Sequence, residues 1–206
     1  MYILGLDVST NTGYCILDCP DKGEPTILSR GALPKVTKPK NFYPKDFVDW
    51  AEKNASGITA LEARVPSNGR EIVVVLEETS KGSKNAMSQK ILEWTHFLLA
   101  KHFLESLELG RISRLRYMMT GEWRNKVGCV MTKEEKAQNK FVSKSSDKVV
   151  KDPTTNKRIG KVGKKHVNVR RANEIFSLNL KLKDNDQADA ILLSYACYLS
   201  MLEDSK

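Results

Sequence analysis

Short apolar runs alternate with turn-forming residues over the first part of the chain. Residues 2–8 form one apolar run, and the polar cluster at 9–13 separates it from a second run at 14–17. A third strand-like run lies within residues 25–33. Apolar runs bounded by such turn clusters are typical of β-hairpins. The pattern therefore predicts a three-stranded antiparallel meander at the N-terminus.

Helical and strand-like patterns then alternate. Loosely helical spacing at 47–65 is interrupted by Gly57, and an uninterrupted β-branched run at 72–76 is typical of a strand buried on both faces. A long amphipathic helix is expected at 85–107, a strand at 112–118 and the start of a short helix at 120–123. Helices are predicted again at 169–178 and 186–201. This order predicts an α/β fold with a mixed five-stranded sheet flanked by helices.

One segment interrupts this pattern. Residues 133–165 are polar, rich in lysine and poor in apolar side chains, with Pro153, Gly160 and Gly163 as breakers. Such composition favours a mobile insertion or a hairpin. We expect a single domain over residues 1–206 that carries this lysine-rich insertion.

Length and composition narrow the class of protein. A chain of 206 residues with 40% hydrophobic residues suffices for one substantial core. No stretch reaches the roughly 18 apolar residues that span a bilayer, so no membrane association is expected. The four cysteines form no CxxC pair, which gives no indication of zinc and suits a reducing compartment. These features predict a soluble, cytoplasmic protein.

The net charge of +9 is concentrated in one region. Residues 121–171 contain fifteen Lys and Arg against five Asp and Glu, whereas the rest of the chain is close to neutral. A regional excess of positive charge favours a polyanionic partner. The simpler alternative is a solvated lysine-rich loop that keeps the protein in solution.

Carboxylates occur where strands and a helix begin or end. Asp7 ends the first predicted strand, Glu77 ends the buried run, and Asp186 and Asp189 begin the last helix. The i, i+3 spacing of the last two places them on one helix face. Clustered carboxylates raise one another's pKa unless a cation neutralises them, and hard oxygen ligands suit Mg²⁺ or Mn²⁺.

Each of these residues also has a plainer interpretation. Asp186 could be a favourable first-turn residue, with Asp184 as N-cap and Gln187 completing a capping box. Asp7 alone could merely begin a turn. A strand buried on both faces gives no rule for choosing between Glu77 and Glu78. Asp189 is harder to explain in this way, because its neighbours are apolar and an unpaired charge there is costly.

Three motifs, in this order, resemble RuvC-type Holliday junction resolvases of the ribonuclease H-like superfamily. They are GLDVSTNTGY at 5–14, VVLE at 74–77 and DQADA at 186–190. The resemblance favours Glu77 over Glu78 and covers nearly the whole chain. A further segment, WRNKVG at 123–128, is similar to phage-encoded members. The long lysine-rich stretch departs from what bacterial members lead us to expect.

The resemblance implies a ribonuclease H-like fold and a metal-dependent endonuclease that resolves Holliday junctions in DNA recombination and repair. Asp7, Glu77, Asp186 and Asp189 would hold two Mg²⁺ ions, which Mn²⁺ could replace, and would form the catalytic centre. Symmetric cuts imply a homodimer, and Trp94, Phe97 and Phe103 on the helix at 85–107 make that helix the candidate interface; alternatively these aromatics are ordinary core residues. The expected setting is a bacterial or phage-infected cell.

Basic residues of the charged region would hold the DNA backbone. The candidates are Arg124, Lys126, Lys133, Lys136, Lys140, Lys164, Lys165, Arg170 and Arg171.

Other functions are compatible with parts of the pattern. Within nucleases, a broader flap or branched-DNA enzyme or an RNA-processing relative is the alternative. Residues 7–13 also resemble the phosphate loop of actin-like ATPases and sugar kinases, but those proteins need a second such domain and a second glycine-rich loop. A DNA-binding module that keeps the fold without catalysis is the third possibility, and the full carboxylate set argues against it.

Overall fold

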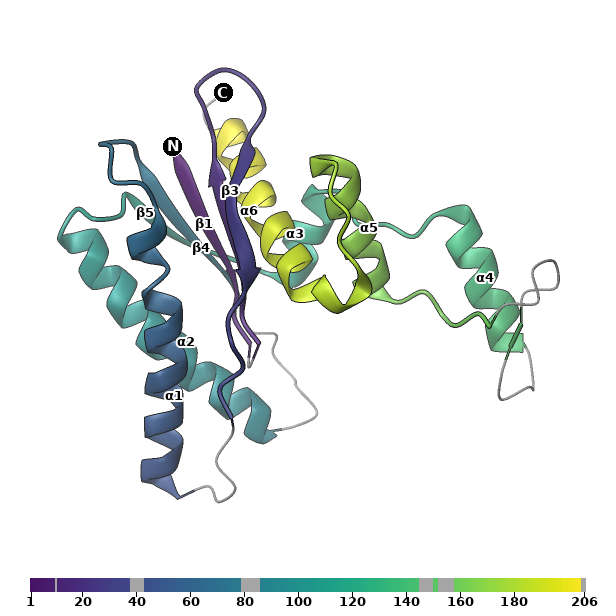
Figure 1. Cartoon of the computed structure of the whole chain (residues 1–206), viewed down its shortest axis with the longest axis horizontal. Coiled ribbons are helices and arrows are strands. Elements are labelled where there is room, and N and C mark those ends of the chain that lie inside the picture. The colour runs from purple at the N-terminus through teal and green to yellow at the C-terminus, as the bar shows by residue number, and fades with distance from the viewer. Residues whose placement is uncertain (10, 38–42, 79–85, 145–149, 152–157, 205–206) are drawn as a thin grey trace.

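The computed structural model describes residues 1–9, 11–37, 43–78, 86–144, 150–151 and 158–204. Strands and helices alternate in the order that the sequence predicts, with one additional helix (Figure 1). The strands are β1 (Tyr2–Asp7), β2 (Gly13–Asp18), β3 (Thr26–Ala32), β4 (Ile72–Glu77) and β5 (Arg114–Met118). The α-helices are α1 (Pro44–Thr59), α2 (Ala86–Glu108), α3 (Thr120–Lys126), α4 (Lys133–Lys144), α5 (Lys164–Phe176) and α6 (Asn185–Asp204). Two short 3₁₀ helices are η1 (Glu62–Arg64) and η2 (Leu182–Asp184).

The five strands form one mixed sheet in the order β3-β2-β1-β4-β5. β1 pairs antiparallel with β2, and β2 with β3, which confirms the predicted meander. β4 pairs parallel with β1 and with β5, so the carboxyl ends of these three strands meet at one edge. The α/β class with a mixed five-stranded sheet is thus confirmed.

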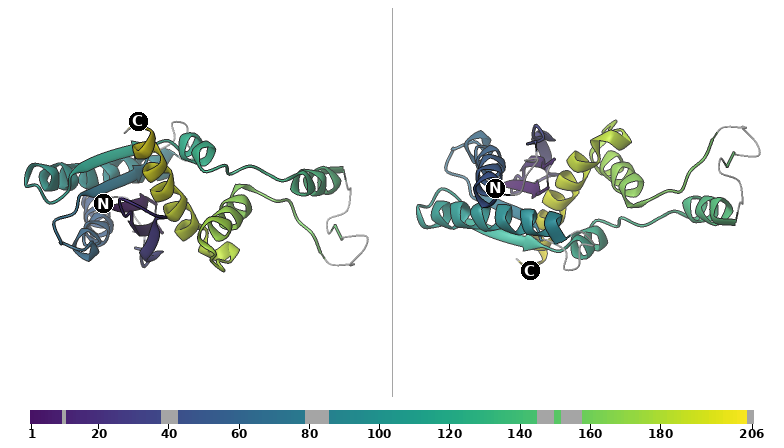
Figure 2. Two further views of the ribbon diagram at one scale, coloured as in Figure 1. Left: turned by 90° about the horizontal axis from the view of Figure 1, so that it is seen from above. Right: turned by 90° about the horizontal axis from the view of Figure 1, so that it is seen from below.

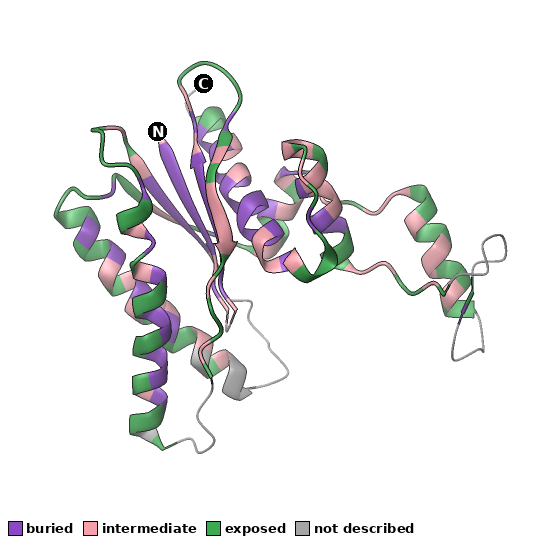
Figure 3. Ribbon diagram, in the orientation of Figure 1, coloured by how far each residue is buried: buried purple, intermediate pink, exposed green. Residues whose placement is uncertain are grey.

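Helices cover both faces of the sheet, and the strands in its middle are largely buried (Figure 3). The two cores divide along the strands by residue parity. Ile3, Val73 and Val75 pack with α3, α5 and α6. Leu4 and Leu6 of β1 point the other way, toward α1 and α2. Because successive strand residues face opposite sides, Asp7 and Glu77 both belong to the face that α6 covers.

The lysine-rich segment contains more regular structure than the sequence led us to expect. Its first part is the helix α4, and its last two residues, Lys164 and Lys165, already belong to α5. The prediction therefore missed a helix at residues 133–144, whereas an antiparallel bridge between Lys151 and Arg158 agrees with the hairpin that it expected. Thr132 and Glu135 form a reciprocal cap: the Glu135 amide donates to Thr132 Oγ1 at 3.2 Å and the Thr132 amide to Glu135 Oε2 at 2.8 Å. This capping box and a run of good helix formers stabilise α4.

Some helix boundaries differ from the prediction. The pattern at 47–65 divides into α1, which passes through Gly57, and η1. α5 begins five residues earlier than expected. Asn85, the predicted start of the helix at 85–107, lies outside the described residues. Of the helices that the structure describes, none is both long and apolar enough to cross a membrane.

Candidate active site

Strand register brings Asp7 and Glu77 to the same edge of the sheet. Leu6 lies opposite Leu76 in the parallel pair of β1 and β4, so each carboxylate follows directly after the paired residues. Both side chains are half-buried and face α6, whereas Glu78 is exposed. The sheet geometry therefore selects Glu77, a choice that strand pattern alone left open.

Two glycines allow the start of α6 to approach these strand ends. A Cβ atom at Gly13 would overlap the backbone carbonyl of Asp186, and one at Gly5 would overlap Ser194 Oγ. Only glycine fits where a helix backbone packs this closely on a strand. This close packing carries Asp186 and Asp189 to the end of β1, beside Asp7.

Glu77 is held by α3, which follows β5. Thr120 Oγ1 donates a hydrogen bond to Glu77 Oε1, and Trp123 Nε1 donates to Oε2 at 3.3 Å. Trp123 is fully buried, so its indole has a fixed position. Trp123, the first residue of the segment at 123–128, thus orients the Glu77 carboxylate. The sequence alone did not indicate this role.

Asp189 has two partners. Asn168 of α5, which is 1% exposed, donates from Nδ2 to Asp189 Oδ1 at 2.6 Å. Arg124 Nη2 lies 4.0 Å from Asp189 Oδ2, and the Arg124 guanidinium lies over the Trp123 ring at 5.0 Å. Sequence reasoning placed Arg124 on DNA and missed Asn168 altogether, because only the packing of α5 on α6 brings Asn168 to the centre.

Asp186 accepts hydrogen bonds from the side-chain amides of Asn11 and Asn185. The alternative interpretation of Asp186 through a capping box does not hold. Asp184 belongs to η2 and accepts from the Lys181 amide at 2.9 Å, while Gln187 Oε1 accepts from Arg30 at 3.2 Å. Neither residue caps α6 in the expected way.

The electrostatics tie the four carboxylates together. The pKa of Asp7 lies well above its ordinary value, chiefly because of burial and then because of the negative charges of Glu77, Asp189 and Asp186. Burial likewise raises the pKa of Asp189 to about 6, with Glu77 and Asp186 adding to the increase and Asn168 and Arg124 opposing it. Asp7 and Asp189 therefore each lie near enough to Glu77 and Asp186 to be affected by their charges.

Lys165 is a second cation, besides Arg124, that acts on this centre. Its ammonium group, at the start of α5, lowers the pKa of Asp7 against the larger effects of burial and the three carboxylates. Lys165 is exposed, and its charge is available to a ligand that approaches the carboxylates. Sequence analysis grouped it with the other basic residues and gave no reason to single it out.

The donor set suits a hard divalent cation. Burial and neighbouring negative charges raise the pKa values of Asp7 and Asp189, and a bound cation would relieve the repulsion. Within the described ranges, no three acidic, histidine or cysteine side chains already form a metal cluster. The carboxylate oxygens that make hydrogen bonds accept them from the side chains of Thr120, Trp123, Asn168, Asn11 and Asn185. Ion binding would therefore require some of these side chains to rotate.

The remaining predicted DNA contacts divide into two groups. Lys133, Lys136 and Lys140 on α4 and Lys164 on α5 are exposed. The others already have partners inside the protein. Lys126 Nζ lies 2.5 Å from Glu203 Oε2, Arg171 bonds the Val127 carbonyl and Glu174, and Arg170 bonds Glu135, Glu174 and the Val130 carbonyl.

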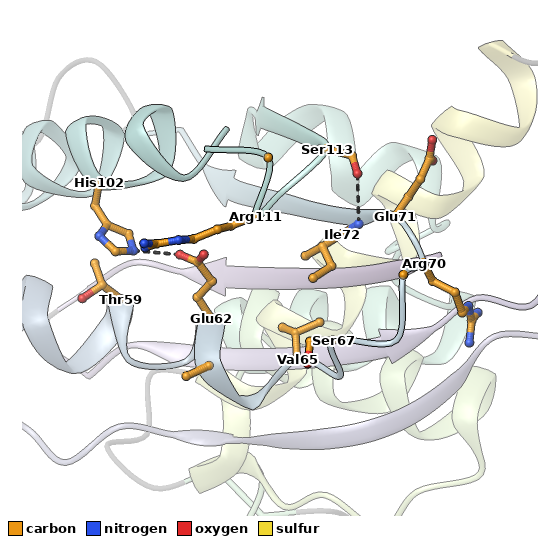
Figure 4. Close-up of a pocket in the computed structure, with 13 residues that line it drawn as sticks. Thr59, Glu62, Val65, Ser67, Arg70, Glu71, Ile72, His102, Arg111 and Ser113 are labelled. Atoms are coloured by element: carbon orange, nitrogen blue, oxygen red, sulfur yellow. Dashed lines mark hydrogen bonds and ion pairs between the residues drawn. The ribbon is translucent and has the colours of Figure 1, made fainter. Parts of the chain in front are cut away.

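A cavity of about 680 Å³ lies at the opposite end of β4 from the carboxylates (Figure 4). His102 Nε2 and Ser106 Oγ both bond Glu62 Oε2, at 2.8 and 2.9 Å, and so join α2 to η1. The carboxylate is shared by two neighbours and no hydroxyl is activated by the imidazole. We interpret this cluster as a structural link.

No protein-family model and no curated protein matches the sequence. Two solved structures of RuvC from Thermus thermophilus match its fold. The one with a Holliday junction substrate has a TM-score of 0.60 at 11% identity and covers 98% of this chain and 96% of RuvC. The other has a TM-score of 0.60 at 14% identity and covers 99% and 97%. This chain has the ribonuclease H-like fold of RuvC. The yeast mitochondrial Holliday junction resolvase Ydc2 also aligns, with a TM-score of 0.49, 12% identity and coverage of 98% and 82%.

The likeness to RuvC extends over nearly the full length of both chains. β1, β4 and α6, which carry all four carboxylates, therefore lie within the region that aligns with RuvC.

Proposed function

We propose that this protein is a metal-dependent endonuclease that cuts branched DNA, with the Holliday junction as its principal substrate. The observation that carries the proposal is the meeting of Asp7, Glu77, Asp186 and Asp189 at one edge of a RuvC-like sheet, where burial and the charges of the other three raise the pKa of Asp7. Comparison with RuvC supports the DNA substrate, since RuvC has been solved with a Holliday junction.

The four carboxylates would hold two Mg²⁺ ions, or Mn²⁺ in their place. When bound, such ions supply an activated water and stabilise the leaving 3′-oxygen, which gives 5′-phosphate and 3′-hydroxyl ends. The protein's own groups prepare the site. Asn168 and Trp123 fix the orientations of Asp189 and Glu77, and Lys165 adds a positive charge beside Asp7 where the phosphate would approach.

Paired cuts across a junction need two centres, so we further propose a homodimer. The exposed face of α2 supports this, because Trp94 is 45% and Phe97 is 68% exposed, and Leu104 on the same helix is half exposed. Phe103, also named from the sequence as an interface aromatic, is instead fully buried in the core. The proposed interface therefore rests on Trp94, Phe97 and Leu104.

A cleavage comparison tests the proposal. Purified protein with Mg²⁺ is incubated with labelled four-way junction, flap, linear duplex and RNA–DNA hybrid. We expect paired cuts near the junction centre, ends that a ligase can rejoin, and no cutting after addition of EDTA. Preferred cutting of flaps or hybrids would support the broader nuclease or RNA-processing alternative, and binding without cutting would indicate a non-catalytic DNA-binding module.

A further inference from the structure

The helix α4 stands apart from the body of the molecule (Figures 1 and 2). A connecting segment leads from α3 into α4, and a second segment, residues 158–163, leads back into α5. We call residues 129–144 and 158–163 together the arm. Both views place α4 at the far end of the molecule from α1 and α2, beyond α5.

Four lysines form a ridge along one side of α4. Lys133, Lys136, Lys140 and Lys144 are separated by three, four and four residues, and all are exposed. At about 100° per residue, this spacing confines them to an arc of about 80°. The ridge therefore presents four positive charges in one direction.

Another side of α4 is fastened to the returning segment. Asn139 Nδ2 donates to the Val162 carbonyl at 2.9 Å, and the Val162 amide donates to Asn139 Oδ1 at 2.7 Å. Gln138 Nε2 donates to the Gly160 carbonyl at 2.7 Å. These bonds fix which side of the helix faces outward, so the direction of the lysine ridge is set by the arm itself.

An ion pair at the base fixes the arm to the body. Arg170 of α5 donates from Nε to Glu135 Oε1 at 3.0 Å and from Nη2 to Oε2 at 3.1 Å. Its Nη2 also donates to the Val130 carbonyl at 2.9 Å. A bidentate arginine–carboxylate pair constrains direction as well as distance. We call the Arg170–Glu135 pair the latch.

The returning segment connects the ridge to the carboxylate centre. Arg158 and Lys161 are exposed along it, and it leads into the first two residues of α5, the exposed Lys164 and Lys165, of which Lys165 acts on Asp7. The six residues at 158–163 span up to about 20 Å when extended. Because α4 stands beyond α5 in both views, a phosphate held by the ridge would lie apart from a phosphate at the centre (Figures 1 and 2).

We propose that the arm holds a second duplex of a branched DNA, distinct from the duplex that is cut, and that the latch sets the angle at which it does so. This inference rests on the proposed function. Lysines in a row contact successive phosphates without reading sequence. In this arrangement a linear duplex bound at the centre would not need to contact α4, which lies beyond α5, whereas a second duplex of a junction would (Figures 1 and 2). The arm therefore selects for branched DNA.

Two latch variants change the net charge in opposite directions. Glu135→Ala makes the protein more positive and Arg170→Gln makes it less positive, yet both break the latch. We expect each to lower the ratio of junction affinity to linear-duplex affinity. Glu134→Ala is the control for Glu135→Ala, since Glu134 is exposed on the same turn and is not part of the latch. If the two latch variants instead moved junction and duplex affinity together according to charge, the latch would have no role.

A lysine variant tests the ridge directly. Replacement of Lys133, Lys136, Lys140 and Lys144 by Gln should flatten the log–log salt dependence of junction binding by about 0.9 for each phosphate that the ridge no longer neutralises. Linear-duplex binding should keep its slope. The matched control replaces four exposed lysines of the body that lie outside α2, Lys22, Lys35, Lys45 and Lys53.

The outcomes separate this inference from the proposed function. If the wild-type protein neither prefers nor cuts branched DNA, the proposed function fails. If it does both, but the ridge variant loses junction and duplex binding equally or resembles the body control, the arm inference is overturned while the nuclease proposal stands.

Discussion

The carboxylate centre and the arm solve opposite physical problems. The centre gathers like charges in a buried place and holds each carboxylate with a neighbouring donor, such as Asn168 for Asp189 and Thr120 for Glu77. The arm spreads positive charges over exposed helix and contacts the body at few points. Chemistry depends on position within a fraction of an ångström, whereas phosphate binding depends mainly on the number and direction of charges. Single substitutions should therefore reduce cleavage severely at the centre and reduce DNA binding only modestly on the arm.

The largest effect is expected at Asp7. Asp7→Asn should lower cleavage by several orders of magnitude, because it removes a proposed metal ligand while junction binding remains. Single-turnover cleavage and binding isotherms on the same junction measure the two quantities. Asp21→Asn, at an exposed aspartate remote from the centre, serves as the charge-matched control. Wild-type cleavage by Asp7→Asn would remove this residue from the centre.

The next effect distinguishes two neighbours on β4. Glu77→Gln should reduce the cleavage rate by at least about a hundredfold, the upper end of what loss of a supporting partner to a metal ligand costs. Glu78→Gln should stay close to wild type, since Glu78 is exposed and lies beyond the face that α6 covers. Equal losses in the two variants would contradict the strand register described above.

Asn168→Ala tests the support of the centre. Asp189 would lose the buried donor at 2.6 Å, and we expect cleavage to fall by about 10–100-fold with unchanged junction affinity. The Mg²⁺ concentration for half-maximal activity should rise, a change that mere loss of stability does not produce. A parallel fall in stability and activity, with the Mg²⁺ dependence unaltered, would argue against the positioning role.

Repulsion at the centre also has a stability signature. In the metal-free protein the pKa of Asp189 is raised from 3.8 to about 6, so the ionised carboxylate disfavours the folded state. The contribution of Asp189 to the free energy of unfolding is fully present below pH 3.8 and is lost as the pH rises through about 6. Asp189→Asn should thus be more stable than wild type by up to about 3 kcal/mol at pH 7, with the difference vanishing near pH 4.

The stabilities of wild type and Asp189→Asn must be compared with each other at each pH. Burial lowers the pKa of His96 to about 4, so His96 works in the opposite direction over the same range. That contribution is common to both proteins and cancels in the difference. Chemical denaturation of wild type and Asp189→Asn with EDTA present measures it, and a difference that stays constant from pH 4 to pH 7 would contradict the proposed repulsion.

Sequence patterns were sufficient for the sheet and its strand ends, because apolar periodicity and turn clusters fix both locally. They were insufficient where residues distant in the chain meet. Asn168 and Lys165 reach the centre only through the packing of α5, and no local signal marks either one. From the sequence, Arg170 and Arg171 were expected to be free to contact DNA. In the structure their guanidinium groups instead bond Glu135, Glu174 and backbone carbonyls. α4 was missed for a different reason: polarity was interpreted as disorder, although the capping box at Thr132 and Glu135 was visible.

The smallest expected effect concerns Lys126, which the sequence grouped with the DNA contacts. The structure pairs its ammonium with Glu203 on α6 at 2.5 Å, and Glu203 is largely exposed. Surface ion pairs of this kind contribute about 0–1 kcal/mol to stability. If the pair is only structural, Lys126→Gln and Glu203→Gln should each change stability by less than about 1 kcal/mol and leave junction affinity nearly unchanged. If Lys126 instead contacts a phosphate, Glu203→Gln frees it and should tighten junction binding, whereas Lys126→Gln should weaken binding. Salt-dependent binding of both variants decides between these outcomes, since only a phosphate contact changes the slope, by about 0.9. Opposite shifts in the two variants would extend the DNA surface from the arm to α3, and unchanged binding in both would confine it to the arm and the start of α5.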